Sequence, residues 1–253
     1  MPTAPLAALV RHCDRTLRTA EFTDWDGAHN GLQAENSGRV TRIAATVDAS
    51  LATVRLAAAA GANLLLVHHG LFWSPQHPWT GNRYTLLRSL LDTDLAVYSS
   101  HLPLDAHPKL GNSAQLAAAL GLRRKRLFFE TKGRPIGMRG ELRCTRDELA
   151  ALLTLATGAP PKLLPGGGER CVKIGVVTGG AGAELRQAAA EGVDTFITGE
   201  GPHCTYALAE DAGINVFYAG HYATETFGVK ALAAELAKKF RLPWVFLDHP
   251  TGL

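Results

Sequence analysis

Three apolar segments that read as strands are each followed by imidazole or carboxylate side chains. The five residues are His68, His69, Asp105, His221 and Glu225. Where a strand ends, the chain turns, so neighbouring side chains can face one crevice, and open α/β sheets bind their ligands there. Three imidazoles and two carboxylates suit Zn, Mn, Fe or Ni, and two-metal sites carry such ligands. The lack of a cysteine ligand favours a catalytic over a structural site.

Each feature also has a simpler interpretation when it is taken alone. A pair such as His68-His69 occurs at strand ends without any metal. Asp105 is equally typical of a turn or of a helix start. Glu225 lies four residues after His221, in what reads as the first helical turn, where the helix macrodipole favours a carboxylate. Only the combination of the three segments indicates a metal centre.

The elements that must position these side chains alternate between strands and helices. In the first half we expect strands over 40–47, 63–67 and 95–99, helices over 51–60, 83–92 and 113–120, and a loop over 103–108. In the second half we expect strands over 139–144, 172–178, 195–198, 215–218 and 244–247. We expect helices there over 145–157, 205–213 and 224–240, and one more that follows the glycine-rich turn at 179–182 and ends at about residue 191. This alternation at βαβ spacing predicts an α/β fold.

The composition changes at the basic cluster 123–126, which has the sequence RRKR. We therefore expect a first lobe of residues 1–125 plus 219–253, which carries the metal ligands, and a second lobe of residues 126–218. The cluster itself is most simply a solvated loop, although it also raises a weaker hypothesis of nucleic-acid binding. With 26 Lys and Arg against 23 Asp and Glu, no broad basic field exists, so nucleic acid is not an expected partner.

The overall composition excludes several classes of protein. Of 253 residues, 46% are hydrophobic and 19% are charged, which is typical of a globular protein and argues against disorder. The four cysteines are scattered and form no C-x-x-C pair, which argues against a disulfide scaffold or a thiolate zinc site. No apolar run reaches the roughly 18 residues of a membrane span, and we see no signal peptide. We expect a cytoplasmic protein.

The motifs together resemble the GTP cyclohydrolase 1 type 2-like family, also called the Ngg-one-interacting-factor-three-like family. The matching pieces are NGLQ at 30–33, TVDAS at 46–50, LVHHG at 66–70, SH at 100–101 with LD at 104–105, TGE at 198–200 with His203, and GH at 220–221 with TE at 224–225. They follow the family's order over nearly the whole chain.

The resemblance implies a ligand set and an architecture. The ligands of two divalent cations, of the Zn, Mn, Fe or Ni type, would be His68, His69, Asp105, His221 and Glu225. Glu225 would bridge the two metals, with His69 and Asp105 on one and His68 and His221 on the other. The fold would have two α/β lobes of βαβ type with the metal site in the cleft between them, in the short form without an inserted middle domain. A homohexamer is expected.

Three further residues match family positions outside the ligand set, and the resemblance implies catalytic roles for them. His101 would orient Asp105 or a metal-bound water, and Glu200 and His203 would handle protons. Packing around the ligands and helix capping are the simpler alternatives for all three.

The leading hypothesis is a dinuclear metal-dependent hydrolase of the cyclohydrolase type. It would use a metal-activated water on a cyclic amide or a nucleotide-type small molecule, with GTP as the candidate that the family name suggests. The alternative is a metal-binding interaction or regulatory protein without turnover. No membrane partner is expected.

Overall fold

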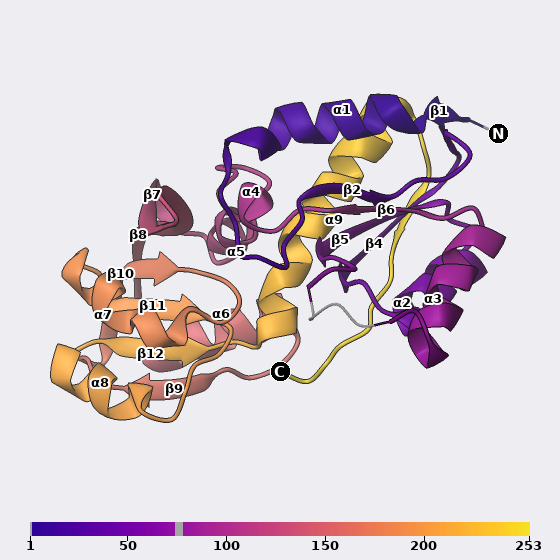
Figure 1. Cartoon of the computed structure of the whole chain (residues 1–253). Helices are drawn as coiled ribbons and strands as arrows, with labels where there is room; N and C mark the ends of the chain where they lie inside the picture. Colours follow the sequence, from indigo (N-terminus) through magenta and orange to yellow (C-terminus); the bar gives the residue numbers. More distant parts are fainter. Residues whose placement is uncertain (1, 74–77) are drawn as a thin grey trace. The chain divides into compact units, whose positions relative to one another are not determined.

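The protein is described here by a computed structural model that covers residues 2–73 and 78–253. The chain divides into two compact units, each with its own sheet (Figure 1). The first unit comprises residues 1–104 and 228–249, and the second comprises residues 105–227 and 250–253. Helices accompany strands in both units, so the predicted α/β class is confirmed.

The first unit is built on a five-stranded sheet. Its strands, in spatial order, are β13 (Trp244–Phe246), β4 (Ile43–Asp48), β5 (Leu64–His69), β6 (Ala96–Ser99) and β2 (Gly31–Ala34). The first four run parallel, and β2 is antiparallel to β6. A separate short pair joins β1 (Ala4–Pro5) to β3 (Arg39–Val40). The central strands are buried along almost their whole length, as continuous apolar runs predict for a parallel sheet.

Two helices of the first unit, α2 (Leu51–Ala59) and α3 (Gly81–Asp92), pack against one hydrophobic core together with β5 and β6. Ser50 caps α2 in a reciprocal capping box with Thr53. On another part of this unit, α1 (Leu6–Leu17) meets the last turns of α9 (His221–Phe240), where the ring centroids of His12 and Phe240 lie 5.9 Å apart. A single turn of 3-10 helix, η1 (Thr19–Glu21), follows α1.

The second unit is built on a six-stranded mixed sheet. Its strands, in spatial order, are β7 (Arg123–Thr131), β8 (Arg134–Thr145), β10 (Arg170–Val176), β11 (Thr195–Thr198), β12 (Asn215–Tyr218) and β9 (Lys162–Pro165). Strands β10, β11 and β12 are parallel, and the other pairs are antiparallel. The parallel centre aligns the carboxyl ends of three strands at one edge.

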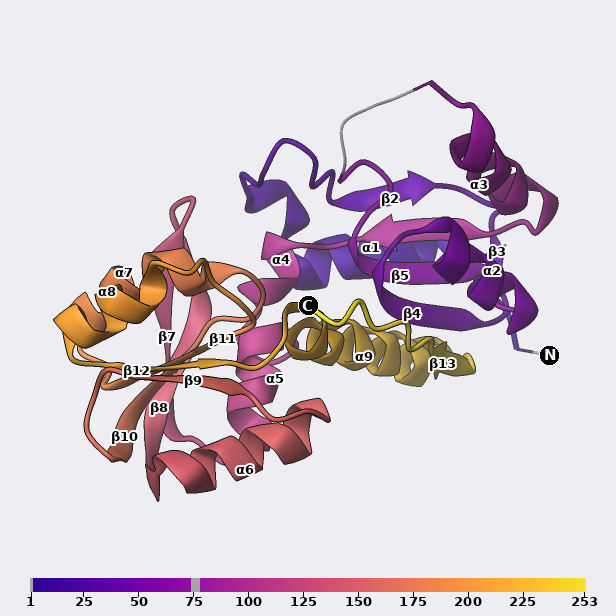
Figure 2. The ribbon, with the colours of Figure 1, turned by 90° about the horizontal axis from the view of Figure 1, so that it is seen from below.

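Helices cover both faces of the second sheet (Figure 2). On one face lie α5 (Asn112–Ala119) and α6 (Arg146–Thr157), which share a core that includes Leu116 and Leu149. On the other face lie η2 (Ala181–Glu184), α7 (Leu185–Ala190) and α8 (Thr205–Ala212), and their core includes Leu185, Phe196 and Ala209. Both faces are therefore buried, in keeping with the apolar character of β10, β11 and β12.

The strands and helices predicted from the sequence are present, with ends that differ by a few residues. Two interpretations were wrong. The basic cluster 123–126 is not a loop but the start of β7, and the loop expected over 103–108 contains the short helix α4 (Leu102–Asp105). Four consecutive charged residues show no alternation, because β7 is an edge strand whose first residues are all exposed. Helix α1 and strands β2 and β9 were not anticipated.

The boundaries of the two units lie at 104/105 and 227/228, whereas the sequence suggested 125/126 and 218/219. Helix α5 accounts for the first difference, since Leu116 and Ala117 pack with Leu149 and Ile174 of the second unit. With these boundaries, His68 and His69 belong to the first unit. The other three predicted ligands belong to the second unit, and they are Asp105, His221 and Glu225. None of the helices within the described ranges is long and apolar enough to span a membrane.

Candidate metal centre

Three buried imidazoles gather at the carboxyl edge of the first unit's sheet. His68 and His69 are the last residues of β5, and their ring centroids lie 5.0 Å apart. His101 follows the end of β6, and its ring centroid lies 4.9 Å from that of His68 and 5.7 Å from that of His69. Each ring offers one nitrogen to a set in which all three atoms lie within 4.8 Å of one another. This spacing allows them to share a metal ion.

Nδ1 of each of these three rings forms a hydrogen bond with an oxygen atom. Nδ1 of His68 donates to the carbonyl of Ser100 at 2.9 Å. Nδ1 of His69 lies 2.8 Å from Oδ1 of Asp48, which β4 places opposite His69 in the sheet. An imidazole that donates from Nδ1 presents the lone pair of Nε2, and metal-binding histidines are commonly oriented in this way. The rings are thus prepared to bind a cation through Nε2.

Asp24 orients His101 in the same manner. Its Oδ1 lies 2.8 Å from Nδ1 of His101, while Oδ2 accepts from the backbone N–H of Leu102 at 3.0 Å and from the Asn30 side chain at 2.8 Å. Burial raises the pKa of Asp24, but the hydrogen bond and charge of His101, with the other donors, outweigh it and hold the pKa below its usual value. Asp24 is therefore an ionised carboxylate that fixes the His101 ring.

Trp73 lies against two of the three imidazoles. Its ring centroid is 4.6 Å from that of His69, in a tilted stack, and 4.6 Å from that of His101, edge to face. The side chain is 39% exposed, so one part of the indole faces solvent while another packs on the histidines. Trp73 therefore shields the cluster and provides an aromatic surface beside it.

In the second unit, a histidine and two carboxylates meet where the parallel strands end. Gly199 N–H donates to the carbonyl of Gly179 at 2.8 Å, and Gly220 N–H donates to that of Gly199 at 3.0 Å, which ties the three strand ends together. The side chain of Glu200 then lies 2.8 Å from Nδ1 of His221. Glu225, one helical turn after His221, places Oε2 3.2 Å from its Nε2.

The carboxylates of Glu200 and Glu225 make the surroundings of His221 favourable for a positive charge. Burial lowers the pKa of His221, but the hydrogen bonds and charges of Glu225 and Glu200 outweigh burial and raise it to about 9. Glu225 is 3% exposed, so its charge is poorly screened by water. The residues that stabilise the imidazolium would stabilise a metal cation for the same electrostatic reason, and N and O donors of this kind suit a first-row metal.

The remaining predicted residues differ in their surroundings. Asp105 is buried in α4, and its Oδ1 accepts from Nδ2 of Asn112 at 2.9 Å. His203 is exposed in the segment before α8, and the structure gives its side chain no hydrogen bond or ion pair with any described residue. The structure thus joins His101 to the histidine cluster and Glu200 to His221, but it does not bring His203 to either group.

Sequence reasoning assigned no role to three residues that shape the site. Asp48 carried a usable signal, since it follows the predicted strand directly. Asp24 lies in a segment without regular structure, 77 residues before His101, and nothing local marks it. Trp73 follows the His68-His69-Gly70 turn, where an aromatic residue indicates nothing specific.

A family model, Duf34/NIF3 (NGG1p interacting factor 3), matches residues 5–251 of the chain. The chain belongs to this family. It is 42% identical over 247 residues to a protein of Deinococcus radiodurans, with 97% of this chain and 93% of the relative covered. It is 43% identical over 249 residues to one of Halobacterium salinarum, with 96% and 97% covered. Both relatives are named GTP cyclohydrolase 1 type 2 homolog.

Solved structures agree with this assignment. A crystal structure of a protein from Thermus thermophilus superposes with a TM-score of 0.90 at 40% identity, covering 99% of this chain and 100% of that one. A protein called ybgI, described as of unknown function, superposes with a TM-score of 0.90 at 36% identity and the same coverage. The family and fold that the sequence motifs predicted are confirmed.

Proposed function

We propose that the protein is a dinuclear metal-dependent hydrolase of the cyclohydrolase type. The proposed ligands of two divalent cations are His68, His69, Asp105, His221 and Glu225. The proposal carries over the ligand set that the family resemblance implies, and it extends to this chain the activity that the names of its relatives suggest.

One observation carries the proposal. In four imidazoles, Nδ1 lies 2.8–2.9 Å from an oxygen atom, and these histidines are His68, His69, His101 and His221. Metal-binding histidines almost always donate their other ring nitrogen in this way, because the bond fixes the ring and keeps the lone pair of the second nitrogen in one direction. Burial of the first three adds to this argument, since buried polar side chains need a defined partner.

The chain's own residues supply proton handling around such a centre. When bound, two divalent cations lower the pKa of a water molecule and polarise a carbonyl of the substrate. Asp24 holds the Nδ1 proton of His101, so His101 can accept and return a proton at Nε2. Glu200 holds Nδ1 of His221, and as a half-exposed carboxylate it can exchange protons with solvent. A catalytic role for His203 stays a prediction.

The proposal has three further parts. The substrate is a cyclic amide or nucleotide-type small molecule, with GTP the first to be tried, because the relatives' names point to it. The working assembly is a homohexamer, as the family resemblance implies. The site of action is the cytoplasm, which fits the four free thiols of Cys13, Cys144, Cys171 and Cys204.

The first experiment measures metal per chain in protein purified without a His tag, for the wild type and for Glu225→Ala. We expect about two equivalents in the wild type, since two-metal sites carry this kind of ligand set, and a sharp fall in the variant. Glu235→Ala is the matched control, because Glu235 is also on α9 but pairs with His12. Absence of metal after equilibration with Zn, Mn, Fe and Ni salts would overturn the proposal.

A second measurement separates the hydrolase from a metal-binding regulatory protein. The metal-loaded wild type is incubated with GTP and with a panel of cyclic amides, and ring opening is followed by formate release and mass spectrometry. Turnover that disappears in Glu225→Ala and survives in Glu235→Ala supports the hydrolase. Full metal occupancy with no turnover on any compound would favour the regulatory alternative.

A further inference from the structure

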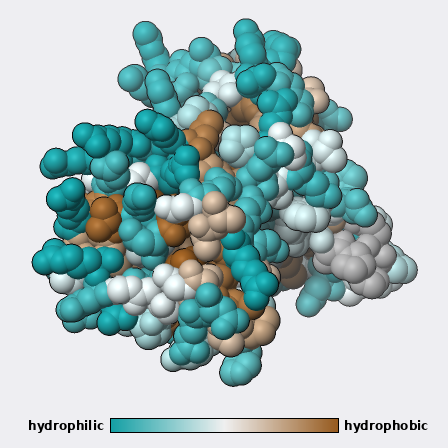
Figure 3. Space-filling view, turned by 90° about the vertical axis from the view of Figure 1, so that its left-hand side faces the viewer, coloured by the Kyte–Doolittle hydropathy of each residue, from teal (hydrophilic) through white to brown (hydrophobic). Residues whose placement is uncertain are grey.

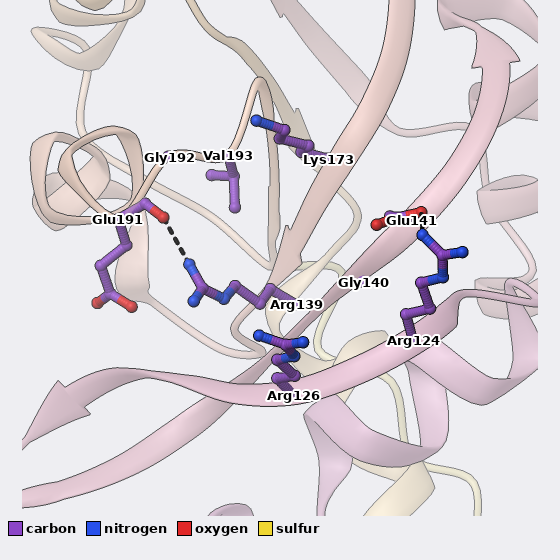
Figure 4. A pocket seen from close by; sticks show the side chains of 9 residues that line it. All are labelled: Arg124, Arg126, Arg139, Gly140, Glu141, Lys173, Glu191, Gly192 and Val193. Atoms are coloured by element: carbon purple, nitrogen blue, oxygen red, sulfur yellow. Dashed lines mark hydrogen bonds and ion pairs between the residues drawn. The ribbon is translucent and has the colours of Figure 1, made fainter.

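A pocket in the second unit is lined by none of the residues proposed to bind metal. It has a volume of about 510 Å³ and is formed by β7, β8, β10 and the residues that follow α7 (Figure 4). Its charged side chains are Arg124, Arg126, Arg139, Lys173, Glu141 and Glu191. Cations thus outnumber carboxylates by four to two, and the volume is in the range of small-molecule sites.

The sheet register places two arginines that line this pocket directly opposite each other. Arg126 on β7 is paired directly with Arg139 on β8, and Figure 4 shows both side chains lining the pocket, with that of Arg139 extending to the backbone of Glu191. Like charges directly opposite each other on a sheet destabilise it. An anion between the two groups would remove that repulsion.

Among the described residues, neither carboxylate of the pocket forms an ion pair with Arg126 or Arg139. Both oxygens of Glu191 accept from the backbone N–H of Phe129, at 3.1 and 3.2 Å. Glu141 instead forms an ion pair with Arg124, at 3.4 Å. Both negative side chains are thus committed to other donors.

The cations, in contrast, keep donors available. Arg139 donates through Nη1 to the backbone carbonyl of Glu191 at 2.6 Å, which fixes the position of its guanidinium group. Within the described ranges, the side chains of Arg126 and Lys173 have no hydrogen bond or ion pair. Figure 3 shows one face of the molecule, on which hydrophilic residues surround several hydrophobic patches. The lining residues make the pocket a positively charged hollow.

We propose that this pocket binds a phosphate-bearing small molecule, with a phosphate or pyrophosphate group held between Arg126 and Arg139. The planar guanidinium group matches two phosphate oxygens with two parallel N–H groups, and such charge-assisted bonds are the strong ones. Arg139 is already fixed by Glu191, so less side-chain freedom is lost on binding. Lys173 adds a third positive charge on the neighbouring strand.

The test is calorimetric titration of inorganic pyrophosphate into protein stripped of divalent metal with a chelator. The variant is Arg126→Ala, which removes an exposed side chain and should leave folding intact. The control is Lys125→Ala, since Lys125 is the next residue on β7, carries the same charge and does not line the pocket. We expect one site per chain, an affinity at least about tenfold weaker in Arg126→Ala, and a change of less than about twofold in Lys125→Ala.

Two further arms separate this pocket from the metal centre and from a nucleic-acid surface. Glu225→Ala should bind pyrophosphate like the wild type, because the pocket uses no residue of the metal proposal, and the pocket can therefore exist whether or not the hydrolase does. A single-stranded oligonucleotide should fail to displace pyrophosphate. The proposal is overturned by equal losses in the two β7 variants, by loss of binding in Glu225→Ala, by displacement with the oligonucleotide, or by the absence of saturable binding.

Discussion

Gly179 lies so close to Glu225 that a Cβ atom on Gly179 would overlap Oε1 of the glutamate. Gly179 also has a φ of 72°, a left-handed backbone conformation that residues other than glycine adopt only with strain. The turn after β10 thus leaves a space that the Glu225 carboxylate fills. The position of a proposed metal ligand depends on the absence of a side chain 46 positions earlier in the sequence.

The substitution Gly179→Ala should disturb both the backbone and the carboxylate. We expect a loss of about 1–2 kcal/mol in the free energy of unfolding from the left-handed backbone, and weaker metal binding because Glu225 must move. Gly158→Ala is the control, since Gly158 has a φ of 85° and open space where its Cβ would be. Denaturant unfolding and metal titration measure the two effects. Equal metal affinity in both variants would contradict this prediction.

The carboxylate of Asp48 should contribute to metal affinity without binding the metal. In Asp48→Asn the hydrogen bond from Nδ1 of His69 to a carboxylate oxygen is replaced by a weaker one to a neutral amide, so the ring loses its fixed orientation. Substitutions of this kind typically reduce metal affinity about 10- to 100-fold. Competition with a chelating dye measures the change. Asp94→Asn, which alters a carboxylate that bonds Ser37 in the same unit, should leave the affinity as it is.

Trp73 should report metal binding through its fluorescence. Its indole lies 4.6 Å from the His69 ring centroid, so a change in charge at His69 alters the surroundings of the fluorophore. We expect metal titration to change the fluorescence emission of the wild type. In Trp73→Phe most of this change should be lost. Trp79→Phe serves as the control, because Trp79 packs under Arg83. An unaltered response in Trp73→Phe would show that another tryptophan senses the metal.

The four thiols should differ in reactivity. Cys204 is exposed, whereas Cys13, Cys144 and Cys171 are buried. Burial raises the pKa of Cys144 from 9.0 to about 11, and it also raises the pKa values of Cys13 and Cys171. Since the thiolate is the nucleophile, iodoacetamide at pH 8 should label Cys204 alone in the folded protein. Peptide mass spectrometry would detect labelling of a buried thiol, which would contradict this difference in burial.

The same shift predicts a loss of stability at alkaline pH. Above pH 9 the thiol of Cys144 ionises in the unfolded chain but stays protonated in the folded protein until about pH 11. The folded state then binds more protons, so the free energy of unfolding falls as the pH rises through this window. Cys144→Ala should flatten the pH dependence there when unfolding is measured with denaturant from pH 8 to 11, and an unchanged slope would refute this assignment.

Phe196 should be among the most important residues for the stability of the second unit. Its side chain is fully buried in the core under α7 and α8, and its ring stacks on Phe129 with centroids 5.8 Å apart. Phe196→Ala should lower the free energy of unfolding by about 3–5 kcal/mol, through lost burial and the cavity left behind. Leu155→Ala, which truncates a side chain that is 85% exposed, should change it little. Comparable losses in the two variants would be inconsistent with this core.

The sequence by itself determined most of the helices and strands. Helix α6 is an example, because Thr145 and Glu148 form the capping box that their spacing predicts. The buried strands β5, β10 and β11 were equally predictable, since continuous apolar runs suit parallel strands covered on both faces. These features depend on neighbouring residues, so a local pattern contains the information. Strand β7 escaped detection because an edge strand needs no apolar face.

The sequence also indicated which residue types gather at strand ends, but only the tertiary structure decided their partners. Asp24 meets His101 across 77 residues, and Arg126 meets Arg139 through the register of a hairpin that begins with a basic cluster. Such pairs depend on strand order, on register and on the path of irregular segments. Contacts between residues far apart in the sequence determine strand order, register and the path of irregular segments. No local pattern of residues encodes them.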